Sequence, residues 1–131
     1  MPHVIIECSA NVADHHDVDS LVAVVHDTVV ATGIAPTSGC RTRAHVLQYC
    51  RIADLHPSNA MVAMVARLGP GRTVEQKQTL IEAVLDAAEV HLGNELSPLS
   101  IAWSMEVQEI DAEVRVNRNH VAAAMAGRET S

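Results

Sequence analysis

Aromatic side chains and basic residues are both scarce in this chain of 131 residues. It contains one Tyr, one Trp and no Phe, and nine Lys plus Arg against sixteen Asp plus Glu, for a formal net charge of −7. Nucleic-acid binding relies on clustered positive charge and on aromatic rings that stack on bases, so the composition argues against it. A core without Phe buries less area per side chain, which favours further burial between copies of the chain.

Long apolar runs and paired cysteines are also missing. The longest apolar run, residues 60–66, is far shorter than the roughly 20 residues that span a bilayer. No basic and apolar leader precedes Val4, so a signal peptide is not expected. Cys8, Cys40 and Cys50 form no CxxC pair, and an odd number of cysteines is a poor disulfide framework. These features predict a cytoplasmic protein without a membrane segment.

Hydrophobic periodicity predicts four strands and two helices. Apolar residues at spacings of three and four indicate helices at 18–32 and 73–92, which Gly33 and Gly93 are expected to end. Thr73 and Gln76 have the spacing of a capping box. Strands are expected at residues 2–8, 41–52, 60–68 and 101–107, and the polar stretch 9–17 is expected to be a loop.

The order of strand, helix and strand, repeated once, predicts an α+β fold. Two βαβ units, at about 1–56 and 57–110, fit one four-stranded mixed sheet with both helices on one face. A polar tail at 111–131 completes a single domain spanning residues 1–131. The other face of the sheet would lack a cover, and packing against copies of the chain would bury it.

Pro2 is a candidate general base. Removal of Met1 would leave its nitrogen as a secondary amine at the start of a strand. An N-terminal amine has an ordinary pKa of about 8, and desolvation or nearby cations lower that pKa, so the amine can be neutral at pH 7 and accept a proton. The simpler interpretation is a proline that the first position of a strand tolerates.

Arginines provide candidate carboxylate-binding groups. Arg41 and Arg43 share one face of their predicted strand, and His45 continues the row. Planar guanidinium groups suit bidentate carboxylate binding, although salt bridges with the surplus acidic residues would also explain the pair. Arg72 precedes the capping Thr73 at a helix N-terminus, where free N–H groups and the helix dipole favour an anion.

Three separated segments carry a family resemblance. They are residues 1–9 (MPHVIIECS), residues 31–45 (ATGIAP leading to GCRTRAH) and residues 69–72 (GPGR). Together they resemble the 5-carboxymethyl-2-hydroxymuconate isomerase family of the tautomerase superfamily. The resemblance implies a homotrimer of duplicated βαβ protomers that uses neither a cofactor nor a metal ion.

The resemblance also implies an activity and its residues. The expected reaction is the 1,5-tautomerisation of a dienol polycarboxylate, 5-carboxymethyl-2-hydroxymuconate, to its conjugated oxo form in aromatic catabolism. Pro2 corresponds to a catalytic N-terminal base, and Arg41 and Arg72 to arginines that bind substrate carboxylates and stabilise charge. Arg43 also matches a family arginine, which we assign to substrate binding.

Three alternatives remain at the level of sequence. A metal site at residues 14–17 with Asp19 is disfavoured, because adjacent residues point apart and no HxH or HExxH spacing occurs. Cys8 as a nucleophile is disfavoured, because it alternates with strand positions expected to be buried. A trimer of this fold that lost the base and acts as a binding or scaffold protein stays open.

Overall fold

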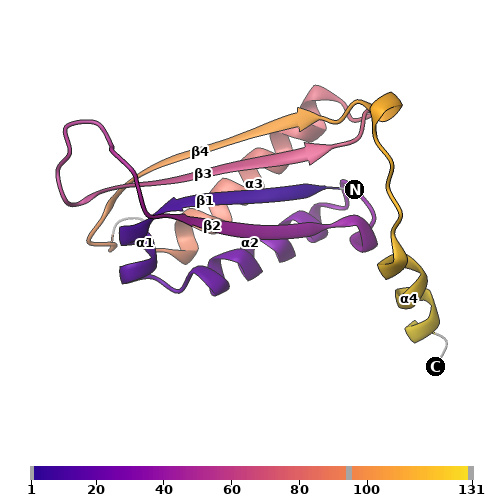
Figure 1. The fold of residues 1–131 in the computed structure, drawn as a ribbon, viewed down its shortest axis with the longest axis horizontal. Helices are drawn as coiled ribbons and strands as arrows, with labels where there is room; N and C mark the ends of the chain where they lie inside the picture. Colours follow the sequence, from indigo (N-terminus) through magenta and orange to yellow (C-terminus); the bar gives the residue numbers. More distant parts are fainter. Residues whose placement is uncertain (1, 94–95, 130–131) are drawn as a thin grey trace.

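The architecture is one sheet with two long helices packed on the same face (Figure 1). The computed structural model describes residues 2–93 and 96–129. Its strands are β1 (His3–Ser9), β2 (Arg41–Leu47), β3 (Asn59–Leu68) and β4 (Ser100–Glu109). Its helices are α1 (Ala10–His15), α2 (Val18–Thr32), α3 (Val74–His91) and α4 (His120–Glu129), with short 3-10 turns η1 (Thr37–Gly39) and η2 (Ala112–Val114).

The sheet is mixed and reflects the two βαβ units. Its strand order is β2-β1-β3-β4, with β1 parallel to β2, β3 parallel to β4, and β1 antiparallel to β3. The helical segment between β1 and β2 contains α2, and α3 connects β3 to β4. The predicted α+β fold, with both helices on one face, is therefore confirmed. The division at 1–56, 57–110 and 111–131 stays a prediction.

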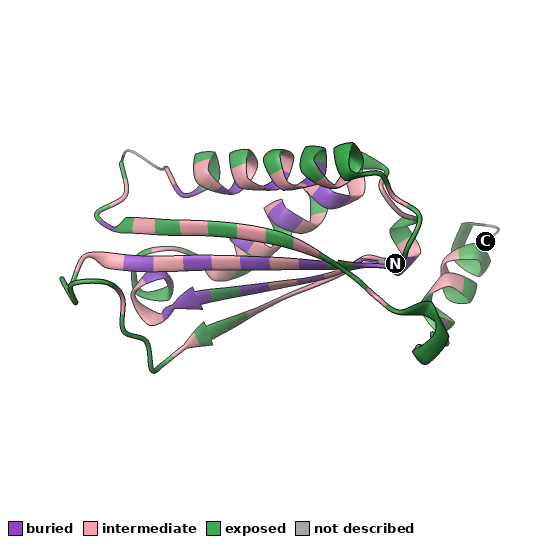
Figure 2. Ribbon diagram, turned by 90° about the horizontal axis from the view of Figure 1, so that it is seen from above, coloured by how far each residue is buried: buried purple, intermediate pink, exposed green. Residues whose placement is uncertain are grey.

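The core lies between the sheet and the two long helices. Alternate residues of β1 and β3 point toward the helices and are buried, which gives β3 its striped pattern in Figure 2. From the sheet, the buried apolar side chains include Val4, Ile6, Cys8, Ala60, Val62, Met64, Ala66 and Leu68. From α2 and α3 they are Leu21, Val25, Val29, Leu80, Val84 and Ala88. Burial on this scale compensates for the absence of Phe.

The opposite face of the sheet is more exposed. Ile5 of β1 and Val65 of β3 are paired across it and are only partly buried. Ala102 of β4 is exposed. The two long helices do not cover this face, as the sequence predicts (Figure 2).

Two predicted element boundaries are wrong. Residues 9–17 are not a loop, since α1 occupies Ala10–His15. Val12 is the one buried residue of this helix, and a single buried position gives no apolar periodicity that would predict a helix. The predicted strand 41–52 ends at Leu47, because β1, its only neighbour in the sheet, ends opposite at Ser9. Residues 48–58 instead form a loop that projects beyond the sheet (Figure 1).

The predicted helix signals are confirmed. The Thr73 side chain accepts from the Gln76 N–H, and the Gln76 side chain accepts from the Thr73 N–H, which completes the capping box of α3. Gly33 ends α2 in the left-handed conformation at φ 66°, which only glycine adopts without strain. The buried face of α3 consists of Leu80, Val84 and Ala88.

We expect Thr73→Ala to lower the free energy of unfolding by about 1 kcal/mol, because the N–H of Gln76 loses its acceptor at the start of α3. Thr73→Ser retains the hydroxyl and is the matched control. Urea unfolding at one fixed protein concentration measures both. Equal stability of the two variants would show that the capping bond contributes nothing.

Candidate active site

The four predicted site residues lie at one end of the sheet. Pro2 immediately precedes β1, Arg41 begins β2, and Arg72 follows the end of β3 (Figure 1). The backbone N–H of Arg41 donates to the carbonyl oxygen of Pro2 at 3.0 Å, so these two residues are neighbours across the sheet. The Pro2 side chain is fully buried. An amine at this position would therefore be poorly solvated, a condition that favours its neutral form.

Arg41 and Arg43 extend from the same face of β2, and His3 of β1 lies between them. His3 is paired with Arg41 in the sheet register, while Arg43 is paired with Ile5. The Arg41 Nη1 atom lies 3.4 Å from His3 Nε2, and the Arg43 Nη1 atom lies 3.2 Å from His3 Nδ1. Arg41 and Arg43 therefore share one face of β2, as predicted. The imidazole of His3 lies between their guanidinium groups, which the sequence did not predict.

The chain's tail also contributes to the site. The second terminal nitrogen of Arg41, Nη2, donates to the side-chain oxygen of Asn117 at 3.0 Å. Asn119 in turn donates to the carbonyl oxygen of Ser38 at 2.8 Å. The segment after η2 is thereby tied to the start of β2. The sequence pattern predicted no role for His3 or Asn117. Strand register places His3 beside Arg41, and a contact between distant parts of the chain brings Asn117 to Arg41.

The pKa of His3 lies below its ordinary value of 6.5. The main cause is burial, followed by the positive charges of Arg41 and Arg43 and then those of Arg115 and Arg67. Each of these effects disfavours a second proton on the ring. His3 is therefore predominantly neutral at pH 7, and it can accept a hydrogen bond.

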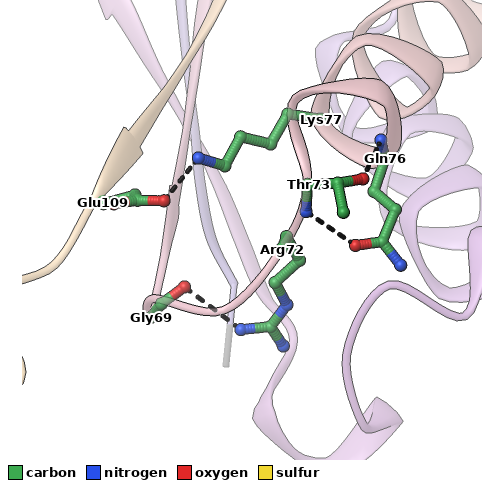
Figure 3. A network of polar contacts seen from close by, with 6 residues as sticks. All are labelled: Gly69, Arg72, Thr73, Gln76, Lys77 and Glu109. Carbon is green, nitrogen blue, oxygen red and sulfur yellow. Dashed lines mark hydrogen bonds and ion pairs between the residues drawn. The ribbon is translucent and has the colours of Figure 1, made fainter.

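Arg72 is held by the backbone at the same end of the sheet. Its Nε atom donates to the carbonyl oxygen of Ile34 at 3.1 Å. Its Nη1 atom donates to the carbonyl oxygen of Gly69 at 3.2 Å, a bond that Figure 3 shows. Nearby, Lys77 of α3 forms an ion pair with Glu109 at the end of β4 (Figure 3). The two hydrogen bonds to Ile34 and Gly69 fix the orientation of the Arg72 guanidinium group. Its hydrogen bonds do not join it to Pro2, Arg41 or Arg43.

The predicted arginines are not neutralised by a carboxylate of the described residues. Over residues 2–93 and 96–129, neither Arg41 nor Arg43 nor Arg72 forms an ion pair with a carboxylate. Salt bridges with the surplus acidic residues therefore do not explain their presence. Guanidinium groups that are partly buried and lack a carboxylate are suited to an anionic ligand.

Two hollows flank this end of the sheet. One, of about 280 Å³, lies beside His3, and its lining includes Arg67, Gln108 and Arg115. The other, also of about 280 Å³, lies between the end of α2 and the start of α3, next to Ile34 and Thr73. A larger hollow, of about 700 Å³, is lined mainly by the projecting loop 48–58. The four predicted site residues line none of these three hollows.

The chemical alternatives find little support. In the described part of the chain, no three His, Cys, Asp or Glu side chains are grouped so that they could hold a metal ion. Cys8 is buried, and burial raises the pKa of its thiol, so it is a poor nucleophile. No helix among the described residues is long and apolar enough to cross a membrane.

A family model and a curated relative point to the same family. A family model described as 5-carboxymethyl-2-hydroxymuconate isomerase matches residues 2–125. A 5-carboxymethyl-2-hydroxymuconate Delta-isomerase from Escherichia coli is 33% identical over 123 residues, which cover 94% of this chain and 98% of that protein. 

Solved structures agree on the fold. A crystal structure of a 5-carboxymethyl-2-hydroxymuconate isomerase from Deinococcus radiodurans R1 has a TM-score of 0.84 at 25% identity, covering 95% of this chain and 93% of that one. A fused 4-OT described as a symmetric trimer has a TM-score of 0.67 at 20% identity, covering 93% and 98%. The second likeness concerns the fold alone.

Proposed function

The chain belongs to the 5-carboxymethyl-2-hydroxymuconate isomerase family, and we propose that it catalyses the cofactor-free tautomerisation of a 2-hydroxymuconate-type polycarboxylate. The name of the Escherichia coli relative supports an isomerase and favours 5-carboxymethyl-2-hydroxymuconate, an intermediate of aromatic catabolism, as the substrate. The observation that carries this proposal is the buried Pro2 next to Arg41, in a site where Arg41, Arg43 and Arg72 have no carboxylate partner among the described residues.

Pro2 is the proposed general base. Met1, which lies outside the described residues, must be removed, because only then does the Pro2 nitrogen change from an amide into a secondary amine. Burial and the nearby Arg41 disfavour the ammonium form of that amine and keep it ready to accept a proton. The neutral amine takes the proton of the dienol hydroxyl and returns it to a carbon at the far end of the conjugated system. One base is sufficient for both steps.

The arginines have the complementary task. Negative charge develops on the dienol oxygen as its proton leaves, and a fixed guanidinium group stabilises that charge most when water is excluded. We assign this role and carboxylate binding to Arg41 and Arg72, and carboxylate binding to Arg43. Arg72 suits the task because two backbone carbonyls hold it in one orientation before substrate arrives.

The assembly is a proposed homotrimer. The face of the sheet opposite the helices carries partly buried apolar groups such as Ile5 and Val65, and packing of sheet against sheet between copies would bury them. The fused 4-OT relative, which shares the fold, is described as a trimer. A small polycarboxylate is the other proposed partner. A cytoplasmic location is also proposed, and three free cysteines support it.

We expect protein that begins at Pro2 to convert 2-hydroxymuconate to its oxo form, as followed by ultraviolet absorbance, with the first residue established by mass spectrometry. Pro2→Ala should lower the rate about 100-fold or more. The sharpest control is protein that retains Met1, since it keeps every side chain but has an amide in place of the amine. Equal turnover by the two forms would contradict the role of Pro2.

Arg41→Ala should lower kcat/KM about 100-fold or more, with a loss in kcat, because it removes charge stabilisation in the transition state. Arg43→Ala should act through KM. A loss in Arg72→Ala that appears mainly in KM would assign Arg72 to binding more than to chemistry. Arg51→Ala is the matched control, since Arg51 lies in the projecting loop at the other end of the sheet. A similar loss in all four variants would refute specific roles.

Sedimentation equilibrium should give a mass three times that of the chain. Val65→Glu places a charge on the sheet face opposite the helices, and we expect it to yield smaller species because a charge buried between copies is costly. Val90→Glu is the control, since Val90 is 79% exposed on α3. A trimer that survives Val65→Glu as well as it survives Val90→Glu would place the contact elsewhere.

A further inference from the structure

We propose that His3 is a positioning residue of this site, whose imidazole holds the guanidinium group of Arg43 in place and leaves a donor of the neighbouring Arg41 open for a substrate carboxylate; this inference rests on the proposed function. His3 stands in the opening motif of the chain, but no role follows for it from the sequence pattern. Its position between the two arginines follows from the parallel pairing of β1 with β2.

The contacts restrict what His3 can do. A guanidinium group has only hydrogen-bond donors, so any bond between an arginine and His3 must be accepted by the ring. Arg43 Nη1 lies 3.2 Å from Nδ1, and Arg41 Nη1 lies 3.4 Å from Nε2. Both ring nitrogens therefore face donors.

A neutral imidazole has one acceptor nitrogen, because the other carries the proton. It can satisfy one of the two arginines at a time. In this proposal Nδ1, which has the shorter contact, accepts from Arg43, and the proton is on Nε2, facing Arg41. One terminal nitrogen of Arg41, Nη2, then donates to Asn117, while the other, Nη1, faces the N–H group of His3 and has no acceptor there. A substrate carboxylate would supply the acceptor that the ring cannot give to Arg41.

The charges around His3 favour this arrangement. Arg41 and Arg43 approach it from β2, Arg67 from β3, and Arg115 from the segment after η2. Two carboxylates, Glu109 and Asp111, line the hollow beside it. The net effect of burial and of the arginines is a lowered pKa of His3, which preserves its one acceptor. A protonated ring would accept nothing and would repel both guanidinium groups.

An isosteric pair of variants isolates the acceptor. His3→Asn retains an oxygen close to the position of Nδ1, whereas His3→Leu has a similar shape and no acceptor. We expect His3→Leu to lower kcat/KM about 10-fold, mainly through KM, the loss expected for one hydrogen bond to a charged group. His3→Asn should recover most of this loss. His15→Leu is the control, since His15 is exposed on α1, at the other end of the sheet.

The outcomes separate a positioning role from a structural one. A structural role predicts a lower unfolding temperature for both His3 variants and no recovery by Asn. Wild-type KM in His3→Leu, or an equal loss in the Asn and Leu variants at unchanged unfolding temperature, would overturn the proposal.

Calorimetric binding of adipate, an unreactive dicarboxylate, tests the same inference without turnover. If the wild-type protein binds adipate and His3→Leu weakens it about 10-fold with recovery in His3→Asn, the positioning role stands even if the proposed reaction fails. If the wild-type protein turns over substrate but adipate affinity is the same in all three proteins, the reaction stands and the role of His3 fails. Absence of adipate binding to the wild-type protein would also overturn the role of His3.

Discussion

The parallel pairing of β1 with β2 determines the position of nearly every group in the proposed site. The hydrogen bond from the Arg41 N–H to the Pro2 carbonyl sets the register, and that register places His3 opposite Arg41. A slip by one residue would turn Arg41 and Arg43 to the helix face, where Val4 and its neighbours need apolar contacts. Burial of one face of β1 therefore stabilises this register. The register in turn fixes the positions of Arg41 and Arg43. Stability and function depend here on the same strand pairing.

The second half of the chain supplies a differently built arginine. Arg72 lies between the end of β3 and the capping box of α3, so its backbone is fixed on both sides. Its side chain bonds to the carbonyl oxygens of Ile34 and Gly69, which belong to the two halves of the fold. A guanidinium group held in this way loses little entropy when a ligand binds, because its orientation is set beforehand. Arg41, in contrast, is held by the side chain of Asn117, which can exchange for a carboxylate.

Charge is distributed unevenly in this protein. Its net charge of −7 repels large polyanions. Four arginines nevertheless lie close enough to His3 to lower the pKa of its imidazole. Such a cluster costs free energy through mutual repulsion, and a carboxylate-bearing ligand relieves that cost. The overall charge disfavours nucleic acid, whereas the local charge suits the small polycarboxylate that we propose as substrate. In the proposed reaction, Arg41 of this cluster would stabilise the negative charge that develops when Pro2 removes a proton.

Local sequence determined the elements and the candidate residues. Apolar periodicity predicted α2, α3 and the four strands, the spacing of Thr73 and Gln76 predicted the capping box, and alternation placed Arg41 and Arg43 on one face. These features depend on residues near one another in the chain, so a linear pattern contains them. 

Tertiary structure alone decided the rest. The end of β2 at Leu47 depends on where β1 ends, and α1 depends on one buried side chain, Val12. The place of His3 between two arginines depends on strand register, and the bond from Arg41 to Asn117 joins residues 76 positions apart. Contacts between distant segments depend on how whole elements pack, so a local periodicity in the sequence does not predict them.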